Sequence, residues 1–254
     1  ILDAQNFSEV ASTGLPAVGN SQIEWADFNN DGFKDVLILG TDNSGAIIIE
    51  LYSNNQDDTF SASGLPVGAL KNSSFIIDDF NDDNRLDIFY TGRDDSENIK
   101  NYLLINDGTG FTVQNDVIGQ YYRARILSLD INLDGQVDLI ISGYNESSTI
   151  EQSVWIQDDL SFTESTDYAL PDIALGSLVA SDFNNDGITD FLTSGENSSA
   201  QFETHIYLIN KDASLTEKIF SPISNILISD IMAQDFTGDG LTDFVFYGID
   251  GSFN

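Results

Sequence analysis

The stretch from Asp27 to Gly40 reads DFNNDGFKDVLILG, and it decides the fold because the same pattern occurs five times. The other copies are DFNDDNRLDIFYTG from Asp79, DINLDGQVDLIISG from Asp130, DFNNDGITDFLTSG from Asp182 and DFTGDGLTDFVFYG from Asp235. Their starts lie 51 to 53 residues apart, and the copies align without gaps. A fixed period of this length marks a repeat architecture in which each copy forms one supersecondary unit.

Other residue types recur at the same phase. A bulky apolar residue follows the first Asp of every copy, and a Gly lies five residues after the last Asp. The apolar residues are Phe28, Phe80, Ile131, Phe183 and Phe236, and the glycines are Gly40, Gly92, Gly143, Gly195 and Gly248. The sequence therefore predicts five structurally equivalent units.

The segments between the copies predict short β-strands. Runs such as 36–39, 46–52 and 102–105 are rich in β-branched and aromatic residues and are bounded by Asp, Asn, Gly and Ser. No segment keeps a 3.6-residue apolar period, so helix should be scarce. About 52 residues with some four short strands is typical of one β-propeller blade, whereas leucine-rich solenoids have shorter repeats and other solenoids need helices.

We therefore expect residues 1–254 to form one all-β propeller domain of four-stranded blades. A closed five-bladed ring is favoured, because residues 1–26 and the 19 residues after Asp235 together amount to most of one more segment between motifs. The alternative is that these repeats form part of a seven- or eight-bladed propeller.

The acidic part of each copy reads D-x-[N/T]-x-D-[G/N]-x-x-D, and we call these segments acidic loops 1 to 5. They span residues 27–35, 79–87, 130–138, 182–190 and 235–243. Calcium prefers six to eight hard oxygen ligands at about 2.3–2.6 Å. A loop of this pattern offers side-chain oxygens at positions 1, 3, 5 and 9 and a backbone carbonyl at position 7. Gly at position 6 permits the left-handed turn that brings the chain back.

The spacing thus predicts about five calcium ions, one in each acidic loop. The expected ligands are Asp27, Asn29, Asp31, Phe33 and Asp35; Asp79, Asn81, Asp83, Arg85 and Asp87; Asp130, Asn132, Asp134, Gln136 and Asp138; Asp182, Asn184, Asp186, Ile188 and Asp190; and Asp235, Thr237, Asp239, Leu241 and Asp243. Two loops depart from the pattern, since Asn84 replaces Gly in loop 2 and Thr237 replaces Asn in loop 5.

Two other interpretations of the loops fit the sequence less well. An EF-hand needs a bidentate Glu at position 12, where this chain has apolar residues, Tyr or Thr. Asp and Asn also favour solvated turns without metal. That interpretation accounts for one loop more easily than for fifteen carboxylates at positions 1, 5 and 9 of five loops.

The charge balance limits the partners. The chain has 42 Asp and Glu against 9 Lys and Arg, a formal net charge of −33. Nucleic acid and anionic membrane surfaces are unexpected partners, because binding them requires cationic side chains. No apolar run approaches the roughly 18 residues that span a bilayer. Extracellular modules commonly bind calcium at about 10⁻⁴–10⁻³ M, so weak calcium sites favour an exported protein.

The repeated loop, the residue after its first Asp and the closing Gly resemble the FG-GAP and VCBS repeats, including the integrin α-subunit propeller. The lead-in Gly-Leu-Pro at 14–16 and 64–66 is similar to repeats of secreted bacterial proteins. The resemblance implies a calcium-binding propeller of an extracellular, secreted or cell-surface protein, with other domains of a longer surface protein as candidate partners. The calcium loops would lie between the first two strands of each blade.

The function expected on this basis is non-catalytic binding or adhesion to a glycan or protein, with structural calcium. Tyr121 and Tyr122 are the candidate ligand contacts, because their segment departs from the other repeats. We expect no binding role for Trp25 and Trp155, because both should pack in the core. We expect none for His205 either, as an exposed strand residue.

Two alternatives remain open at this point: a propeller enzyme acting on polysaccharide, as a glycosidase or lyase, and a structural spacer of a larger adhesin. Carboxylates outside the loops that would serve an enzyme are Glu24, Glu50, Asp94 and Glu203. With no Cys and one His, the chain has little material for a triad or a His-based metal site. A non-enzyme is therefore expected.

Overall fold

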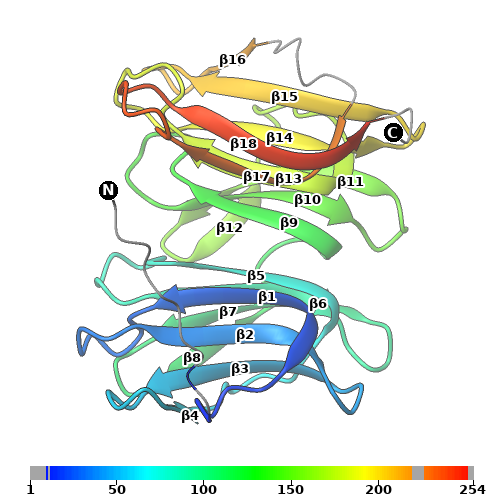
Figure 1. Ribbon diagram of the computed structural model, residues 1–254. Coiled ribbons are helices and arrows are strands. Elements are labelled where there is room, and N and C mark those ends of the chain that lie inside the picture. Colours follow the sequence, from blue (N-terminus) through cyan, green and yellow to red (C-terminus); the bar gives the residue numbers. More distant parts are fainter. Residues whose placement is uncertain (1–9, 11, 219–225, 251–254) are drawn as a thin grey trace.

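The computed structural model describes residue 10, residues 12–218 and residues 226–250. Within these ranges the chain consists of β-strands joined by turns, without an α-helix. Figure 1 shows the strands gathered into separate sheets that follow one another in chain order from blue to red. The predicted all-β class is confirmed.

Four of the sheets are antiparallel, four-stranded and ordered as in the sequence, as propeller blades are. We call the sheets blades 1 to 5. Blade 1 has β1 (Val18–Ala26), β2 (Asp35–Asp42), β3 (Ile47–Asn54) and β4 (Phe60–Ala62); blade 2 has β5 (Lys71–Asp78), β6 (Asp87–Arg93), β7 (Ile99–Asn106) and β8 (Phe111–Asn115); blade 3 has β9 (Tyr122–Leu129), β10 (Asp138–Tyr144), β11 (Ile150–Asp158) and β12 (Ser161–Glu164); blade 4 has β13 (Ile173–Ser181), β14 (Asp190–Asn197), β15 (Phe202–Ile209) and β16 (Leu215–Lys218). The fourth strand of each is short, from three to five residues.

Blade 5 contributes β17 (Ile226–Gln234) and β18 (Asp243–Asp250) to the described structure. The expectation that both chain ends complete this blade concerns residues 1–9, 11 and 251–254, which lie outside the described residues.

Consecutive blades pack face to face. The first strands contact one another in the order β5, β9, β13 and β17, and Gln22 on β1 exchanges two hydrogen bonds with the backbone of Phe75 on β5. In acidic loops 1, 2 and 4 the residue after the first Asp also contacts the next blade. Phe28 lies edge-on to Phe111 of blade 2, Phe80 to Phe162 of blade 3, and the Phe183 ring contacts Phe244 of blade 5. The repeated apolar residue therefore joins these three loops to the next blade.

The repeated Gly packs against a β-bulge. The pairing of the first and second strands shifts register in every blade, for example between Lys71 and Ser74 on β5. A Cβ added to Gly92 would lie 2.6 Å from the Ser73 Cβ and 2.9 Å from the Leu70 Cβ. Gly40, Gly143 and Gly195 meet the same crowding in blades 1, 3 and 4. In these four blades the Gly is needed because the bulged backbone approaches closely.

Gly92→Ala is therefore expected to destabilise the fold by about 2 kcal/mol, as overpacking of a tight site does. Urea denaturation should show a lower midpoint at an unchanged slope. Gly68→Ala is the matched control, since a Cβ there meets nothing within 4 Å. Equal midpoints for the two variants would contradict the close-approach explanation.

The outer faces of blades 1 and 5 leave large apolar side chains exposed. Trp25 on β1 is 52% exposed, and Val245 and Tyr247 on β18 are 54% and 73% exposed. The residues equivalent to Val245 in the other blades are fully buried by the next blade: Leu37, Phe89, Ile140 and Leu192. The expectation that Trp25 is a core residue is thus wrong, and the described residues do not show a closed ring.

Candidate metal centres and central pocket

Every acidic loop connects the first strand of its blade to the second, as the sequence resemblance implied. The strand pair closes directly around it, with Ala26 opposite Asp35 in blade 1 and Leu129 opposite Asp138 in blade 3. The five loops therefore hold equivalent places in five blades.

The first Asp of each loop holds the turn by accepting backbone N–H groups. Asp27 accepts from Asp31 N at 3.1 Å and from Gly32 N at 2.8 Å. The same pair of bonds recurs at Asp79, Asp130, Asp182 and Asp235.

The side chains at positions 3 and 5 of the loop each accept one backbone N–H from the residue two positions further on. The Asn29 side-chain oxygen accepts from Asp31 N, and one Asp31 oxygen accepts from Phe33 N, both at 2.9 Å. The equivalent bonds occur in loops 2, 3 and 4, and loop 5 keeps the one to its Asp239. In loop 5 the Thr237 N–H donates instead to Asp243.

The last Asp of the loop is a structural anchor. Asp35, Asp87, Asp138 and Asp190 are fully buried. Each accepts one N–H from the residue after the first Asp and another from the third strand, 19 residues further on. The two bonds to Asp138 come from Ile131 N at 3.1 Å and Gln157 N at 2.8 Å. One carboxylate thus ties the loop to two strands.

These buried carboxylates lie near like charges. The pKa of Asp87 is raised to about 6, chiefly by burial and also by the neighbouring Asp83 and Asp79 carboxylates, against the lowering effect of two N–H donors. Burial likewise raises the pKa of Asp138 to about 6, with Asp134 adding to the effect. The pKa values of Asp35 and Asp190 are also raised, again chiefly by burial and also by neighbouring loop carboxylates.

The loops fit a hard divalent cation in donor chemistry and charge, but they are not preassembled. Within the described ranges no group of three or more Asp, Glu or His side chains lies close enough to hold a metal ion. The carboxylates bind backbone N–H groups instead. A carboxylate has about four acceptor sites on its two oxygens, so capacity for a cation remains. Calcium binding by the residues predicted above therefore stays a prediction.

The loops are also linked to neighbouring blades. The Asn106 side-chain amide of blade 2 donates to the Phe28 carbonyl of loop 1 at 2.8 Å, and Gln157 of blade 3 donates to the Phe80 carbonyl of loop 2 at 3.0 Å. These two bonds fasten loops 1 and 2 to the next blade.

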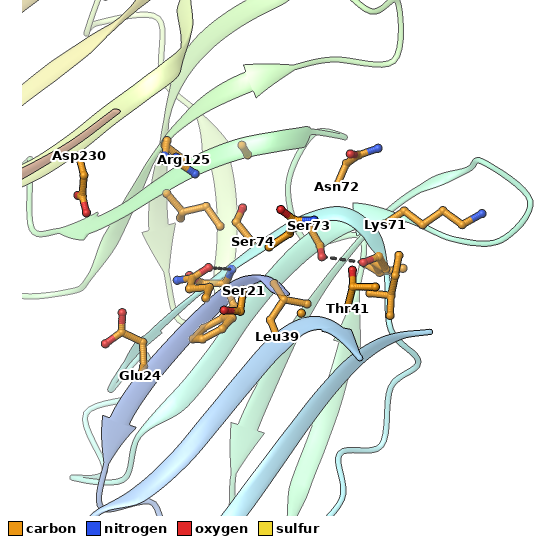
Figure 2. A pocket seen from close by; sticks show the side chains of 18 of the residues that line it. Ser21, Glu24, Leu39, Thr41, Lys71, Asn72, Ser73, Ser74, Arg125 and Asp230 are labelled. Atoms are coloured by element: carbon orange, nitrogen blue, oxygen red, sulfur yellow. Dashed lines mark hydrogen bonds between the residues drawn. The ribbon is translucent and has the colours of Figure 1, made fainter. Parts of the chain in front are cut away.

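A second candidate site lies where the first strands meet. A cavity of about 930 Å³ is lined by residues of all five first strands (Figure 2). Its polar lining includes Asn20, Ser21, Gln22, Glu24, Lys71, Asn72, Ser73, Ser74, Arg125, Ser177 and Asp230. These residues precede the acidic loops by at least three positions and include the bulge residues opposite Gly40 and Gly92. We call this cavity the central pocket.

One polar group in the central pocket has no protein partner. Ser74 is 6% exposed, and its hydroxyl makes no hydrogen bond to any residue that the structure describes. Figure 2 shows it directed from its strand toward the side of the pocket that Arg125 lines. Arg125 is exposed and donates through Nε to the Gly176 carbonyl, which fixes it in place. Partial burial raises the pKa of Glu24.

Sequence reasoning did not identify the central pocket. A signal was present, because Asn-Ser occurs at 20–21 and at 72–73, seven residues before the first Asp in both repeats. The other three repeats have different residues at these positions, so the dipeptide does not stand out as part of the repeat.

The predicted ligand contacts lie elsewhere. Tyr121 is 1% exposed, and its hydroxyl bonds Glu151 and Ser153, so it is a core residue, contrary to the sequence expectation. Tyr122 is half-buried, with the Arg93 guanidinium 3.7 Å from its ring centre. Trp155 is partly buried in the core, as expected.

The candidate catalytic residues are dispersed. Glu24 lines the central pocket, whereas Glu50 accepts from Gly64 N at 2.7 Å and Asp94 from Asn98 N at 2.9 Å in a turn. Glu203 lies 3.1 Å from His205, whose other ring nitrogen is 2.7 Å from Glu217. His205 is therefore held between two carboxylates and is largely buried, not exposed as expected.

Comparison with known proteins gives a match to a repeat family and weak likenesses to solved structures. The model of the FG-GAP-like repeat matches residues 130–193 and 182–246, so each match runs from one acidic loop through the next. No curated protein matches the chain. A solved structure of MPT-4, a mannose phosphorylase from Leishmania mexicana in complex with phosphate ion, is 13% identical over 96% of this chain and 83% of that one. Its TM-score of 0.38 supports no conclusion. The match confirms the resemblance seen in the sequence over residues 130–246, which are similar to the FG-GAP-like repeat.

Proposed function

We propose that this chain is a calcium-stabilised β-propeller module that binds a glycan without catalysis in its central pocket. The observation that carries the proposal is the pocket itself, to which every first strand contributes and in which the buried Ser74 hydroxyl has no protein partner. Buried polar groups are normally hydrogen-bonded, so this hydroxyl suits a ligand or water in the pocket. Ligand pockets in proteins usually have volumes of about 300–1,000 Å³, and the central pocket, at about 930 Å³, lies within that range.

The lining favours a hydroxylated ligand over other classes. Serine hydroxyls and Asn and Gln amides both donate and accept, as sugar hydroxyls do, and Glu24 and Asp230 add acceptors. A net charge of −33 disfavours an anionic ligand. A protein ligand is the other partner class that the sequence left open, and it would have to reach the same groups with an inserted loop.

A glycan array in millimolar calcium tests the proposal. Arg125→Gln should weaken retention of a bound glycan about tenfold or more, because hydrogen bonds from charged groups contribute about 1.5–3 kcal/mol. Lys100→Gln is the matched control, since Lys100 pairs with Asp116 away from the central pocket. Absence of any glycan binder, or equal binding by the two variants, would refute the central pocket as the site.

Calcium in the acidic loops is the second part of the proposal. Its support is the hard-oxygen donor set together with the raised pKa of the buried Asp35, Asp138 and Asp190, which burial causes and the neighbouring loop carboxylates increase. The side chains at positions 1, 3, 5 and 9 and the carbonyl at position 7 would hold the ion. When bound, calcium would offset the repulsion among these carboxylates and stiffen the turns.

The exposed faces of blades 1 and 5 are relevant to how the propeller closes. Trp25, Val245 and Tyr247 would be buried if these blades met, which is the five-bladed arrangement first favoured. Further blades of a seven- or eight-bladed propeller would bury the same side chains. Both arrangements complete a propeller around the central pocket.

An exported location accords with this function. FG-GAP-like repeats are frequent in extracellular proteins, and extracellular calcium suffices for weak sites. Within the described part of the chain, no helix is long and apolar enough to cross a bilayer. We propose a secreted or cell-surface protein of bacterial type, in which this module acts alongside other domains.

One observation favours a second candidate, a polysaccharide-active enzyme. Glu24 and Asp230 both line the central pocket, and the raised pKa of Glu24 suits a general acid. Incubation of the protein with a polysaccharide panel, read by reducing-end release, separates the two functions. Product release that is lost in Glu24→Gln would establish the enzyme and overturn the non-catalytic proposal.

A further inference from the structure

Acidic loop 2 differs from the other loops in carrying a cation at position 7. That position holds Arg85 in loop 2, whereas loops 1, 3, 4 and 5 have Phe33, Gln136, Ile188 and Leu241. The Arg85 Nη2 atom lies 2.5 Å from Asp83 Oδ2. The backbone N–H of Arg85 donates to the other oxygen, Asp83 Oδ1, at 2.9 Å. Arg85 therefore engages both oxygens of the position-5 carboxylate.

The guanidinium is held in this place by its surroundings. Arg85 Nε donates to the Asn106 carbonyl at 2.8 Å, at the end of the same strand whose N–H binds the buried Asp87. The side-chain stem passes beside Gly108, where an added Cβ would lie 3.6 Å from the Arg85 Cδ. Arg85 is thus a fixed part of the loop and not a freely mobile surface residue.

Loops 1 and 3 have neutral amide groups at the equivalent carboxylate. Asp31 Oδ2 accepts from the Gln56 amide at 3.3 Å, and Asp134 Oδ2 accepts from the Asn132 amide at 2.8 Å. Lys34 is the one basic residue in these other loops, at position 8 of loop 1, and no ion pair found within the described residues involves it. A neutral amide can rotate away when a cation binds, but a guanidinium keeps its charge.

We propose that Arg85 takes the place of calcium in loop 2, so that the chain binds four calcium ions and loop 2 is closed by its own side chain. The inference rests on the proposed calcium binding of the other loops. The Arg85 guanidinium occupies the Asp83 carboxylate that the metal would need, and its positive charge repels the metal. Loop 2 would accordingly hold its shape without calcium, while the other four loops depend on the metal.

Calcium titration calorimetry on metal-stripped protein tests this inference. The expected stoichiometry is four for the unmodified chain, five for Arg85→Gln and four for the control Lys34→Gln. A stoichiometry of five for the unmodified chain, or of four for a folded Arg85→Gln, would overturn the role of Arg85.

The converse variant guards against misfolding of Arg85→Gln. Gln136→Arg places the same side chain at position 7 of loop 3, and it should lower the stoichiometry from four to three. An unchanged four would count against the inference. No calcium uptake by any variant would refute the calcium proposal itself, a result distinct from uptake with the wrong count.

Discussion

Removing calcium with a chelator is expected to lower the melting temperature of this protein by more than about 10 °C. A ligand present at a hundred times its Kd stabilises the folded state by about 2.7 kcal/mol per site, so several filled loops add to roughly 10 kcal/mol. For a domain of 150–250 residues, one kcal/mol corresponds to about 2–4 °C. The physical cause is the clustering of acidic side chains near the buried Asp35, Asp138 and Asp190, which a divalent cation would neutralise.

Thermal unfolding followed by circular dichroism, in millimolar calcium and in chelator, provides the measurement. Magnesium at the same concentration is the control for general charge screening, since it prefers octahedral sites at shorter distances. Superimposable melts in calcium, magnesium and chelator would mean that the loops are metal-free turns.

Asp138→Ala is expected to destabilise the calcium-free protein by about 4 kcal/mol, because it leaves two buried N–H groups without acceptors at about 1–3 kcal/mol each. Those groups belong to Ile131 and Gln157, on either side of the blade 3 hairpin. Denaturant unfolding in chelator measures the change.

Asp134→Ala is the matched control, because it removes the same charge from the same loop at an exposed position. In chelator it should cost less than about 1 kcal/mol, as surface substitutions usually do. In calcium both variants should lose the loop 3 site. Equal costs for the two variants in chelator would show that the buried carboxylate is not the anchor inferred here.

Much of the fold follows from the sequence because the motif repeats. The phase of Asp27 and its equivalents located the loops, and the runs after Asp35 and Asp87 located the buried second strands. The residue after the first Asp was recognised as repeated, but its partner on the next blade depends on packing that no single repeat contains.

The site was less predictable, for identifiable reasons. The spacing marked Asp138 as a metal ligand, but its bond to the Gln157 N–H joins positions whose register only the folded sheet sets. The irregular segment around Tyr121 suggested a ligand contact. In the structure Tyr121 instead fills the core. Trp25 is exposed because its face of blade 1 has no neighbour among the described residues.

The short fourth strands have a consequence for crowding. A rim of three to five residues offers few unpaired N–H and C=O groups, so it is a poor template for strand addition by another copy. Many such modules can therefore be displayed densely without joining edge to edge, and the strong negative charge keeps neighbours apart.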